Sequence, residues 1–335
     1  REREPVAAAD LKAAGALTAI LKDALSPNLV QTLEGTPSFV HGGPFANIAH
    51  GCNSVIATMA GLRLADYVVT EAGFGADLGA EKFIDIKCRS AGIRPSAAVL
   101  VATIRALKFH GGVARGDLSE ENLPALRAGL ANLNRHINNL RENYGVPAIV
   151  SINQFVADTD AEVELVMVHC KTLGVQVALS SHWANGGAGA TDLAHMVAEI
   201  CDADTMSANT PHNSFVYPGE LSLWEKLEAV ATKVYHASEI TASSKVRDRL
   251  KGLTDGGYGH LPVCIAKTPY SFSADQKLRG AVSNFKLPIR EVRVANGAEF
   301  VVALAGEIMT MPGLPRVPAS ERISVDESGK LSGLS

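Results

Sequence analysis

The 335-residue sequence lacks several features that would place it in a special class of protein. Its five cysteines contain no CxxC pair, which argues against a zinc site and against a disulfide framework. No apolar run approaches the roughly 20 residues that a membrane helix needs. The first residues carry no signal-peptide pattern. Together these absences predict a cytoplasmic protein that does not bind a membrane.

Positive charge and aromatic side chains are also scarce. The formal net charge is -4, so no general positive field exists to attract nucleic acid, and anionic ligands must be bound locally. Hydrophobic residues make up 47% of the chain, but aromatic residues only 5%. This composition is typical of a globular enzyme, and the length predicts two or three compact units.

Segments with strand and helix patterns alternate along the first two-thirds of the chain. We expect a helix over residues 11–25, with Asp10 as its N-cap and one face against a core, and a second helix within 47–64. Runs that are apolar throughout predict buried parallel strands at 66–72, 97–104, 146–153 and 175–180. Amphipathic stretches predict helices between them at 116–143 and 158–174, and another at 191–200. The predicted class is α/β, with a doubly wound and mostly parallel sheet.

A polar stretch at residues 202–222 divides this alternating region from the rest of the chain. Beyond it, the sequence has a helical part up to about Gly252, a glycine-rich turn, and then strand-like runs. We therefore expect a smaller α+β domain at residues 223–335.

The turns that follow the four predicted strands are rich in charged, aromatic and glycine residues. Because ligands bind at the carboxyl ends of parallel strands, these turns should line one crevice. Glycine there lets backbone N–H groups approach an anion, and Phe155 and Trp183 could enclose a flat ring. Each turn by itself could equally be an ordinary loop, and Trp183 could simply pack in a core. The candidate residues in these turns are Glu71, Gly73, Phe74, Gly75, Asp77, Arg105, Lys108, His110, Phe155 and Trp183.

Five segments, at residues 29–54, 65–83, 101–112, 259–273 and 308–318, resemble formate–tetrahydrofolate ligase. Among them, VATIRALKFHGG at 101–112 is similar to a signature of that family. The resemblance implies an enzyme that uses ATP and Mg²⁺ to make formyl phosphate from formate. The N10 atom of tetrahydrofolate then displaces phosphate and gives 10-formyltetrahydrofolate. A monovalent cation is a further cofactor to consider, and a homotetramer is the implied assembly.

The resemblance also implies a role for each candidate residue. It places the folate ring against Phe155, Leu179 and Trp183, with Phe74 as a weaker candidate. It makes residues 1–140 the remainder of a nucleotide-binding, P-loop NTPase-like domain and 141–222 a Rossmann-like folate-binding unit. The segment at 66–75 further resembles the acidic strand end of dethiobiotin synthetase, so Glu71 is expected to hold Mg²⁺. The remaining assignments are Arg105, Lys108 and His110 with Glu71 in catalysis, and Gly73, Gly75 and Asp77 at the nucleotide phosphates.

One departure from the family is that no GxxxxGK[ST] string occurs in residues 1–335. Two interpretations follow. In the first, the chain is part of a working ligase, as a truncated form, a proteolytic product or one half of a split enzyme, and activity requires an N-terminal P-loop segment. In the second, it is a folate-binding or assembly module without ATP chemistry.

Overall fold

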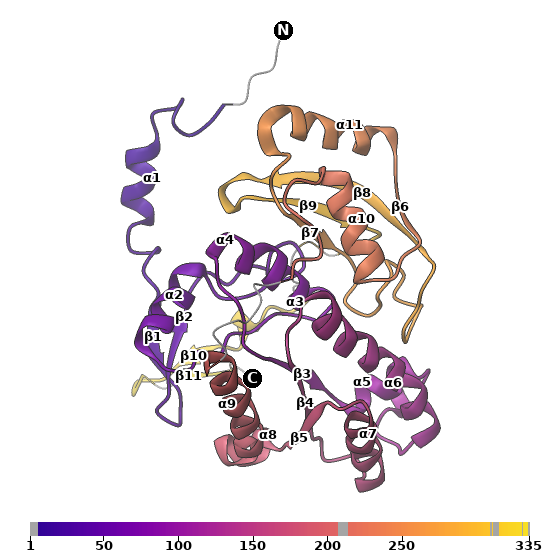
Figure 1. Cartoon of the computed structure of the whole chain (residues 1–335). Coiled ribbons are helices and arrows are strands. Elements are labelled where there is room, and N and C mark those ends of the chain that lie inside the picture. Colours follow the sequence, from indigo (N-terminus) through magenta and orange to yellow (C-terminus); the bar gives the residue numbers. More distant parts are fainter. Residues whose placement is uncertain (1–5, 207–213, 309, 311–314, 330, 334–335) are drawn as a thin grey trace.

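The computed structural model describes residues 6–206, 214–308, 310, 315–329 and 331–333, and it shows a mixed α/β protein (Figure 1). The helices in the first part of the chain are α1 (Ala14–Leu21), α2 (Val55–Leu64), α3 (Gly79–Lys82), α4 (Arg89–Ala91), α5 (Ile104–His110), α6 (Leu123–Asn138), α7 (Asp160–Thr172), α8 (His182–Asn185) and α9 (Thr191–Met206). π-Helical turns continue α3 as η1 (Phe83–Cys88) and α6 as η3 (Asn139–Asn143), and 3-10 turns form η2 (Arg115–Asp117) and η4 (Gly186–Ala190).

A three-stranded parallel sheet forms the centre of the first part of the molecule. Its strands are β3 (Ala98–Ala102), β4 (Ala148–Asn153) and β5 (Gln176–Ser180), in that order. Helices lie on both sides of it, with α5, α6 and α7 opposite α9 (Figure 1). The strands predicted at 97–104, 146–153 and 175–180, and the helices after them, are therefore confirmed. The expected domain border at residue 140 falls between two strands of this single sheet.

Local sequence explains how the helices of this region begin. Asn122 accepts a hydrogen bond from the Ala125 backbone N–H and starts α6. Thr159 and Glu162 form a reciprocal capping box that starts α7. The apolar faces of α5, α6 and α7 then pack on β4 and β5 in one core cluster.

The later part of the chain builds a second, mixed sheet, covered by two helices. Its strand order is β6–β8–β9–β7, in which β8 and β9 are antiparallel and the two outer pairs are parallel. The sheet and its helices form the largest core cluster. The elements are α10 (Leu223–Lys233), β6 (Glu239–Ala242), α11 (Ser244–Leu253), η5 (Thr254–Tyr258), β7 (Val263–Ala266), β8 (Lys286–Ala295), η6 (Asn296–Ala298) and β9 (Phe300–Ala305).

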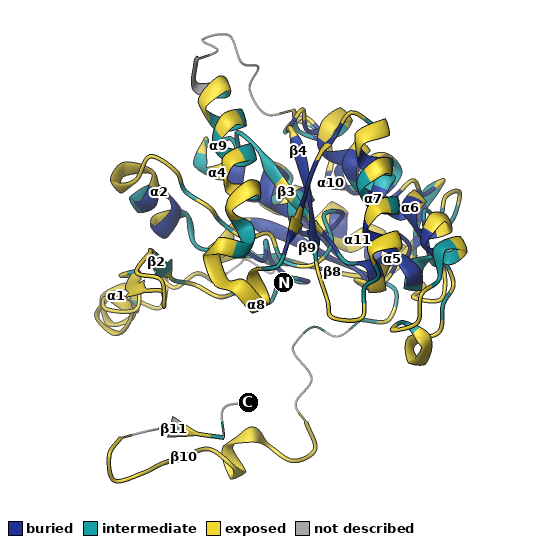
Figure 2. Ribbon diagram, turned by 90° about the horizontal axis from the view of Figure 1, so that it is seen from below, coloured by how far each residue is buried: buried dark blue, intermediate teal, exposed yellow. Residues whose placement is uncertain are grey.

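The ends of the described chain add little to either core. Strands β1 (Asn28–Gln31) and β2 (Pro37–Val40) form a hairpin. Near the other end, η7 (Ala319–Glu321) precedes β10 (Ser324–Val325) and β11 (Leu331–Ser332), and the pair of strands stands apart from the body (Figure 2). In the described part of the chain, no helix combines the length and the apolar character needed to cross a bilayer.

Three expectations about local structure were wrong. The helix expected at 11–25 is shorter, is not capped by Asp10, and has no buried residue, so it faces no core. The segment 66–72 forms no strand, no strand of the described residues pairs with it, and Val69 is exposed. The polar stretch 202–222 begins inside α9, which continues to Met206. Residues 207–213 of that stretch lie outside the described residues.

Candidate functional site

Three apolar side chains lie at the carboxyl ends of two neighbouring strands. Phe155 follows β4, Leu179 belongs to β5, and Trp183 lies in α8, with exposed fractions of 45%, 36% and 87%. The two strand ends are held in register, since Asn153 pairs with Ser180 and the Gln154 N–H donates to the Ser180 carbonyl at 3.0 Å. We call Phe155, Leu179 and Trp183 the aromatic patch. Its side chains are apolar, and the two aromatic ones are accessible to a flat ring.

Arg105 extends the aromatic patch from a third strand end. Thr103, after β3, caps α5 by accepting a hydrogen bond from the Ala106 N–H at 3.1 Å. The Arg105 guanidinium, in the first turn of this helix, lies 5.8 Å from the centre of the Phe155 ring. Asp158 fixes the turn that carries Phe155, by accepting a hydrogen bond from the Phe155 N–H at 2.8 Å. Three of the four predicted turns therefore meet at this edge of the sheet.

Lys108 points away from this surface. Its ammonium group is fully buried, 2.8 Å from the Glu162 carboxylate, and it also donates to the Glu120 carbonyl at 2.7 Å. Burial raises the pKa of Glu162, but hydrogen bonds from Lys108 and two backbone N–H groups outweigh it and keep the pKa below its usual value. Lys108 thus joins α5 to α7, and its role in catalysis stays a prediction.

His110, at the end of α5, contacts the second part of the molecule. Its Nδ1 accepts a hydrogen bond from the Gly280 N–H at 3.1 Å. Burial lowers the pKa of this imidazole, so the neutral form is favoured at neutral pH. A neutral imidazole that accepts a backbone N–H at Nδ1 carries its proton on Nε2.

The glycine turn, which we define as residues 73–79, uses its glycines for contacts within the protein. A Cβ on Gly73 would lie 2.8 Å from the Ala46 Cβ, and one on Gly79 would lie 2.3 Å from the Gly73 carbonyl oxygen. The Gly73 N–H already donates to the Gly51 carbonyl at 2.9 Å. Close backbone packing therefore accounts for these glycines without a ligand, and phosphate binding by Gly73 and Gly75 stays a prediction.

Phe74 is the exposed and strained residue of the glycine turn. Its φ of 68° is unusual for an aromatic side chain. Its ring packs edge-on against Phe45, with ring centres 6.1 Å apart. The Phe74 ring thus contacts the loop that precedes the turn. The role of Phe74 beside the folate ring also stays a prediction.

Asp77 turns into the interior beneath the glycine turn. Its Oδ2 lies 2.6 Å from the ammonium group of Lys267, and both side chains are almost completely buried. Burial raises the pKa of Asp77, but the charges and hydrogen bonds around it, led by the charge of Lys267, together outweigh this effect, so the pKa lies below its usual value and the carboxyl stays ionised. Burial also lowers the pKa of His136 to about 4.

Glu71 is the residue expected to hold Mg²⁺, and it is exposed just before the glycine turn. Among the described residues, no group of three or more histidine, cysteine or acidic side chains could hold a metal ion by itself. Mg²⁺ usually takes only one or two carboxylates and completes its shell with phosphate oxygens and water. A single accessible Glu71 carboxylate fits that requirement.

The glycine-rich loop after Trp183 binds a carboxylate of the protein itself. The Gly187 N–H donates to Oε1 of Glu34, from the β1–β2 turn, at 2.6 Å. A Cβ on Gly186 or Gly187 would lie within 2.4 Å of that carboxylate. The backbone here approaches an anionic group of the protein itself, and binding of an anionic ligand by this turn stays a prediction.

A family model for formate–tetrahydrofolate ligase matches residues 1–335, the whole chain. The chain belongs to this family. Curated relatives with that name include a protein of Sinorhizobium fredii that is 58% identical over 336 residues, covering 100% of this chain and 59% of the relative. Another, from Methylococcus capsulatus, is 60% identical over 332 residues, covering 99% of this chain and 58% of the relative. The chain therefore spans less than two-thirds of the length of these ligases.

Three residues of this ligase-family chain were missed by sequence reasoning. Each contacts a residue from a distant segment: Glu162 binds Lys108, Lys267 binds Asp77, and Glu34 binds the Gly187 N–H. A signal for Glu162 exists in the sequence, because Thr159-x-x-Glu162 is a capping-box pattern. That pattern does not indicate the ion pair of Glu162 with Lys108. No local pattern marks Lys267 or Glu34 as partners, because long-range pairing has no sequence period.

Proposed function

We propose that this chain forms the tetrahydrofolate-binding part of a formate–tetrahydrofolate ligase. In the complete enzyme, formate attacks the γ-phosphate of ATP to give formyl phosphate and ADP. The N10 atom of tetrahydrofolate then attacks the formyl carbon and phosphate leaves, which gives 10-formyltetrahydrofolate. The observation that carries the proposal is the aromatic patch, which lies at adjacent strand ends in a chain whose whole length matches the family.

The geometry suggests what the residues of the chain do. Phe155, Leu179 and Trp183 bind the flat pterin, and the exposed Arg105 guanidinium beside Phe155 supplies positive charge at the same edge. We propose that the glycine turn lies on the phosphate side, with Glu71 as the carboxylate that holds Mg²⁺. When bound, Mg²⁺ would neutralise charge on the phosphate oxygens during phosphoryl transfer. Lys108, paired inside the protein, would act by fixing α5 beneath Arg105.

We propose that residues 1–140 complete a P-loop NTPase-like nucleotide domain together with polypeptide that supplies the P-loop. Apolar side chains that support this lie exposed on α1, on the hairpin and on β3; they include Ile20, Leu29, Leu33, Val99 and Val101. An uncovered apolar strand edge favours association. A cytoplasmic homotetramer that includes the P-loop segment would cover this surface, and light scattering with intact-mass measurement would test that assembly.

The test of the folate assignment is to titrate the protein and its Trp183→Ala variant with tetrahydrofolate. Because Trp183 is 87% exposed, the variant should fold normally. Its binding free energy should weaken by about 1–3 kcal/mol, roughly a 5- to 150-fold loss of affinity, through loss of a stacking partner. Trp224 provides the control. It lies in the second part of the molecule, with its ring centre 3.9 Å from the Arg247 guanidinium. The variant Trp224→Phe should bind normally, and its fluorescence then reports on Trp183 alone. Unchanged affinity in folded Trp183→Ala protein would remove the patch from the site.

The second interpretation of the sequence gives a second candidate function. In that case, the chain is a folate-binding or assembly module without ATP chemistry. Titration with MgATP decides between the two functions. It compares the protein that retains any copurifying polypeptide with the protein from which that polypeptide has been removed. Binding of MgATP together with such a polypeptide supports the ligase, whereas binding of folate alone supports the module.

A further inference from the structure

Lys267 is the first residue after β7, and its charged end is completely buried. Its ammonium group donates to the Asp77 carboxylate at 2.6 Å, to the Ser271 carbonyl at 2.5 Å and to the Thr268 carbonyl at 3.2 Å. The Tyr235 ring lies 4.9 Å from the same nitrogen. All three donor positions of the ammonium group are therefore used, as a buried lysine requires.

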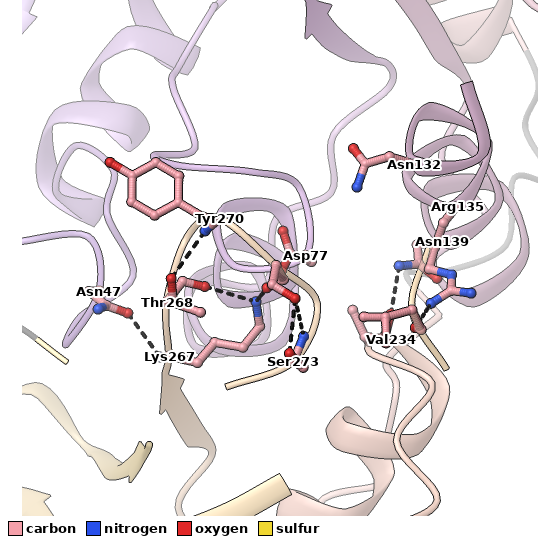
Figure 3. Close-up of polar contacts among 12 residues, drawn as sticks. Asn47, Asp77, Asn132, Arg135, Asn139, Val234, Lys267, Thr268, Tyr270 and Ser273 are labelled. Carbon is pink, nitrogen blue, oxygen red and sulfur yellow. Dashed lines mark hydrogen bonds and ion pairs between the residues drawn. The ribbon is translucent and has the colours of Figure 1, made fainter. Parts of the chain in front are cut away.

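Asp77 connects this ammonium group to the glycine turn. While Oδ2 binds Lys267, Oδ1 lies against Gly75, where an added Cβ would come within 2.6 Å of it. The carboxylate is thus placed between the lysine below and the backbone of the turn above. Figure 3 shows Lys267 reaching Asp77 from the strand end of the second part of the molecule.

Contacts of Asn47 extend the same connection to the loop beside the glycine turn. The Asn47 side chain accepts a hydrogen bond from the Lys267 backbone N–H at 3.2 Å, and its carbonyl accepts one from Lys82 at 2.7 Å. Lys82 lies in α3, directly after the turn. The glycine turn, the loop before it and the end of β7 are therefore joined by buried polar contacts.

We propose that Lys267 is a positioning residue, which holds the glycine turn in its conformation through Asp77. The second part of the molecule, which carries none of the predicted catalytic residues, would thereby set the geometry of the turn predicted to bind phosphate. The inference about phosphate rests on the proposed function, but the inference about the turn rests on the contacts alone. Removing the ammonium group would leave the Asp77 carboxylate buried without a counter-charge, and the turn would open to hydrate it.

The test is hydrogen–deuterium exchange of residues 73–79 in Lys267→Met protein. Exchange in the turn should become at least about tenfold faster, since local opening becomes easier. Lys226 provides a matched control: it is also fully buried, and its ammonium group donates to three carbonyls, those of Gly259, His260 and Leu261. Lys226→Met should lower the thermal stability comparably and leave exchange in the turn unchanged. If both variants accelerate exchange in the turn equally, or neither does, the proposal fails.

The double variant Lys267→Met/Asp77→Asn separates positioning from stability. Without either charge, the melting temperature should recover toward that of the unmodified protein, because no uncompensated carboxylate remains. Exchange in the turn should fall between that of Lys267→Met and that of the unmodified protein, because no carboxylate needs hydration but no ion pair holds residue 77 in place. Recovery of slow exchange in the double variant would show that the ion pair does not position the turn.

Inorganic phosphate and tetrahydrofolate serve as ligand probes in the same experiment. Phosphate should slow exchange of residues 73–79 in the unmodified protein and have no effect in Lys267→Met. If phosphate has no effect on the unmodified protein, phosphate binding by the turn is refuted, while the exchange comparison still decides the role of Lys267. Tetrahydrofolate affinity should change less than about twofold in Lys267→Met, because the aromatic patch lies on the other sheet. A larger loss would indicate general misfolding and overturn the proposal.

Discussion

The predicted site residues fall into two groups that differ in where their side chains point. Phe155, Trp183, Arg105 and Glu71 lie on the surface near strand ends or before the glycine turn. By contrast, Lys108 and Asp77 are buried in ion pairs with Glu162 and Lys267. The two groups look alike in the sequence, as charged or aromatic residues after strands. The difference teaches that such a residue can serve the ligand or support the turn that carries it, and that only its partner tells which.

The comparison predicts that substitutions in the two groups change different properties of the protein. Exposed residues should affect binding with little change in stability, as expected for Trp183→Ala. Buried residues should change stability first. Three substitutions at other buried positions test this.

The largest effect is expected for Glu162→Ala, which leaves the buried Lys108 ammonium group without its carboxylate. Loss of one partner from a buried pair costs about 3–5 kcal/mol of the free energy of unfolding. Denaturant unfolding measures this loss. The neighbouring exposed Glu164→Ala is the control and should change stability by less than about 0.5 kcal/mol. Equal effects of the two variants would show that the pair contributes nothing.

A smaller loss is expected for Gly79→Ala in the glycine turn. The new Cβ would lie 2.3 Å from the Gly73 carbonyl oxygen and 2.7 Å from that of Ala72, so the turn would have to shift. Overpacking of this kind costs about 1–3 kcal/mol. At Gly43, a Cβ would meet no atom within 4 Å, so Gly43→Ala is the matched control. Thermal unfolding of both variants decides whether the glycines serve packing.

The smallest effect is a change in how stability depends on pH. Burial raises the pKa of Asp85 to about 7, although Arg89 and the Val216 N–H partly oppose it. The folded state therefore holds a proton that the unfolded state has lost. The stability that this group contributes is fully present below about pH 4 and is lost as the pH rises through about 7.

The variant Asp85→Asn removes this dependence and keeps an acceptor for the Val216 N–H. Its melting temperature minus that of the unmodified protein should increase from pH 5 to pH 8. Buried His136, whose pKa is lowered to about 4, acts in the opposite sense, so only the difference between proteins is informative. The exposed Asp248→Asn is the control. A difference that stays constant with pH would contradict the assignment.

The central elements could be predicted because their signals are local. Apolar runs identified β3, β4 and β5, and amphipathic stretches identified α6, α7 and α9. The segment 66–72 also has a strand-like pattern but forms no strand, since a strand requires a neighbour as well as a suitable sequence. The prediction that one face of the helix at 11–25 packs on a core also failed, since α1 has no buried residue.

The site was predictable to the extent that sheet topology decides it. Because parallel strands end at one edge, the turns that carry Arg105, Phe155 and Trp183 were expected together, and the structure brings Arg105 and Phe155 into contact. The direction in which Lys108 points could not be predicted, because a helix beginning offers both a solvent side and a buried side. The division of the chain at residue 140 stays a prediction that the continuous β3–β4 pairing does not favour.

The sequence by itself determined the mixed α/β class, the three central strands, the family, and the set of residues able to do chemistry. These follow from residue order, since periodicity, caps and motifs are read along the chain. The tertiary structure decided which of those residues face solvent and which are neutralised inside, through partners such as Glu162 and Lys267. Burial and ion pairing join segments far apart in the chain, and the energy of a charge depends on what folding places beside it.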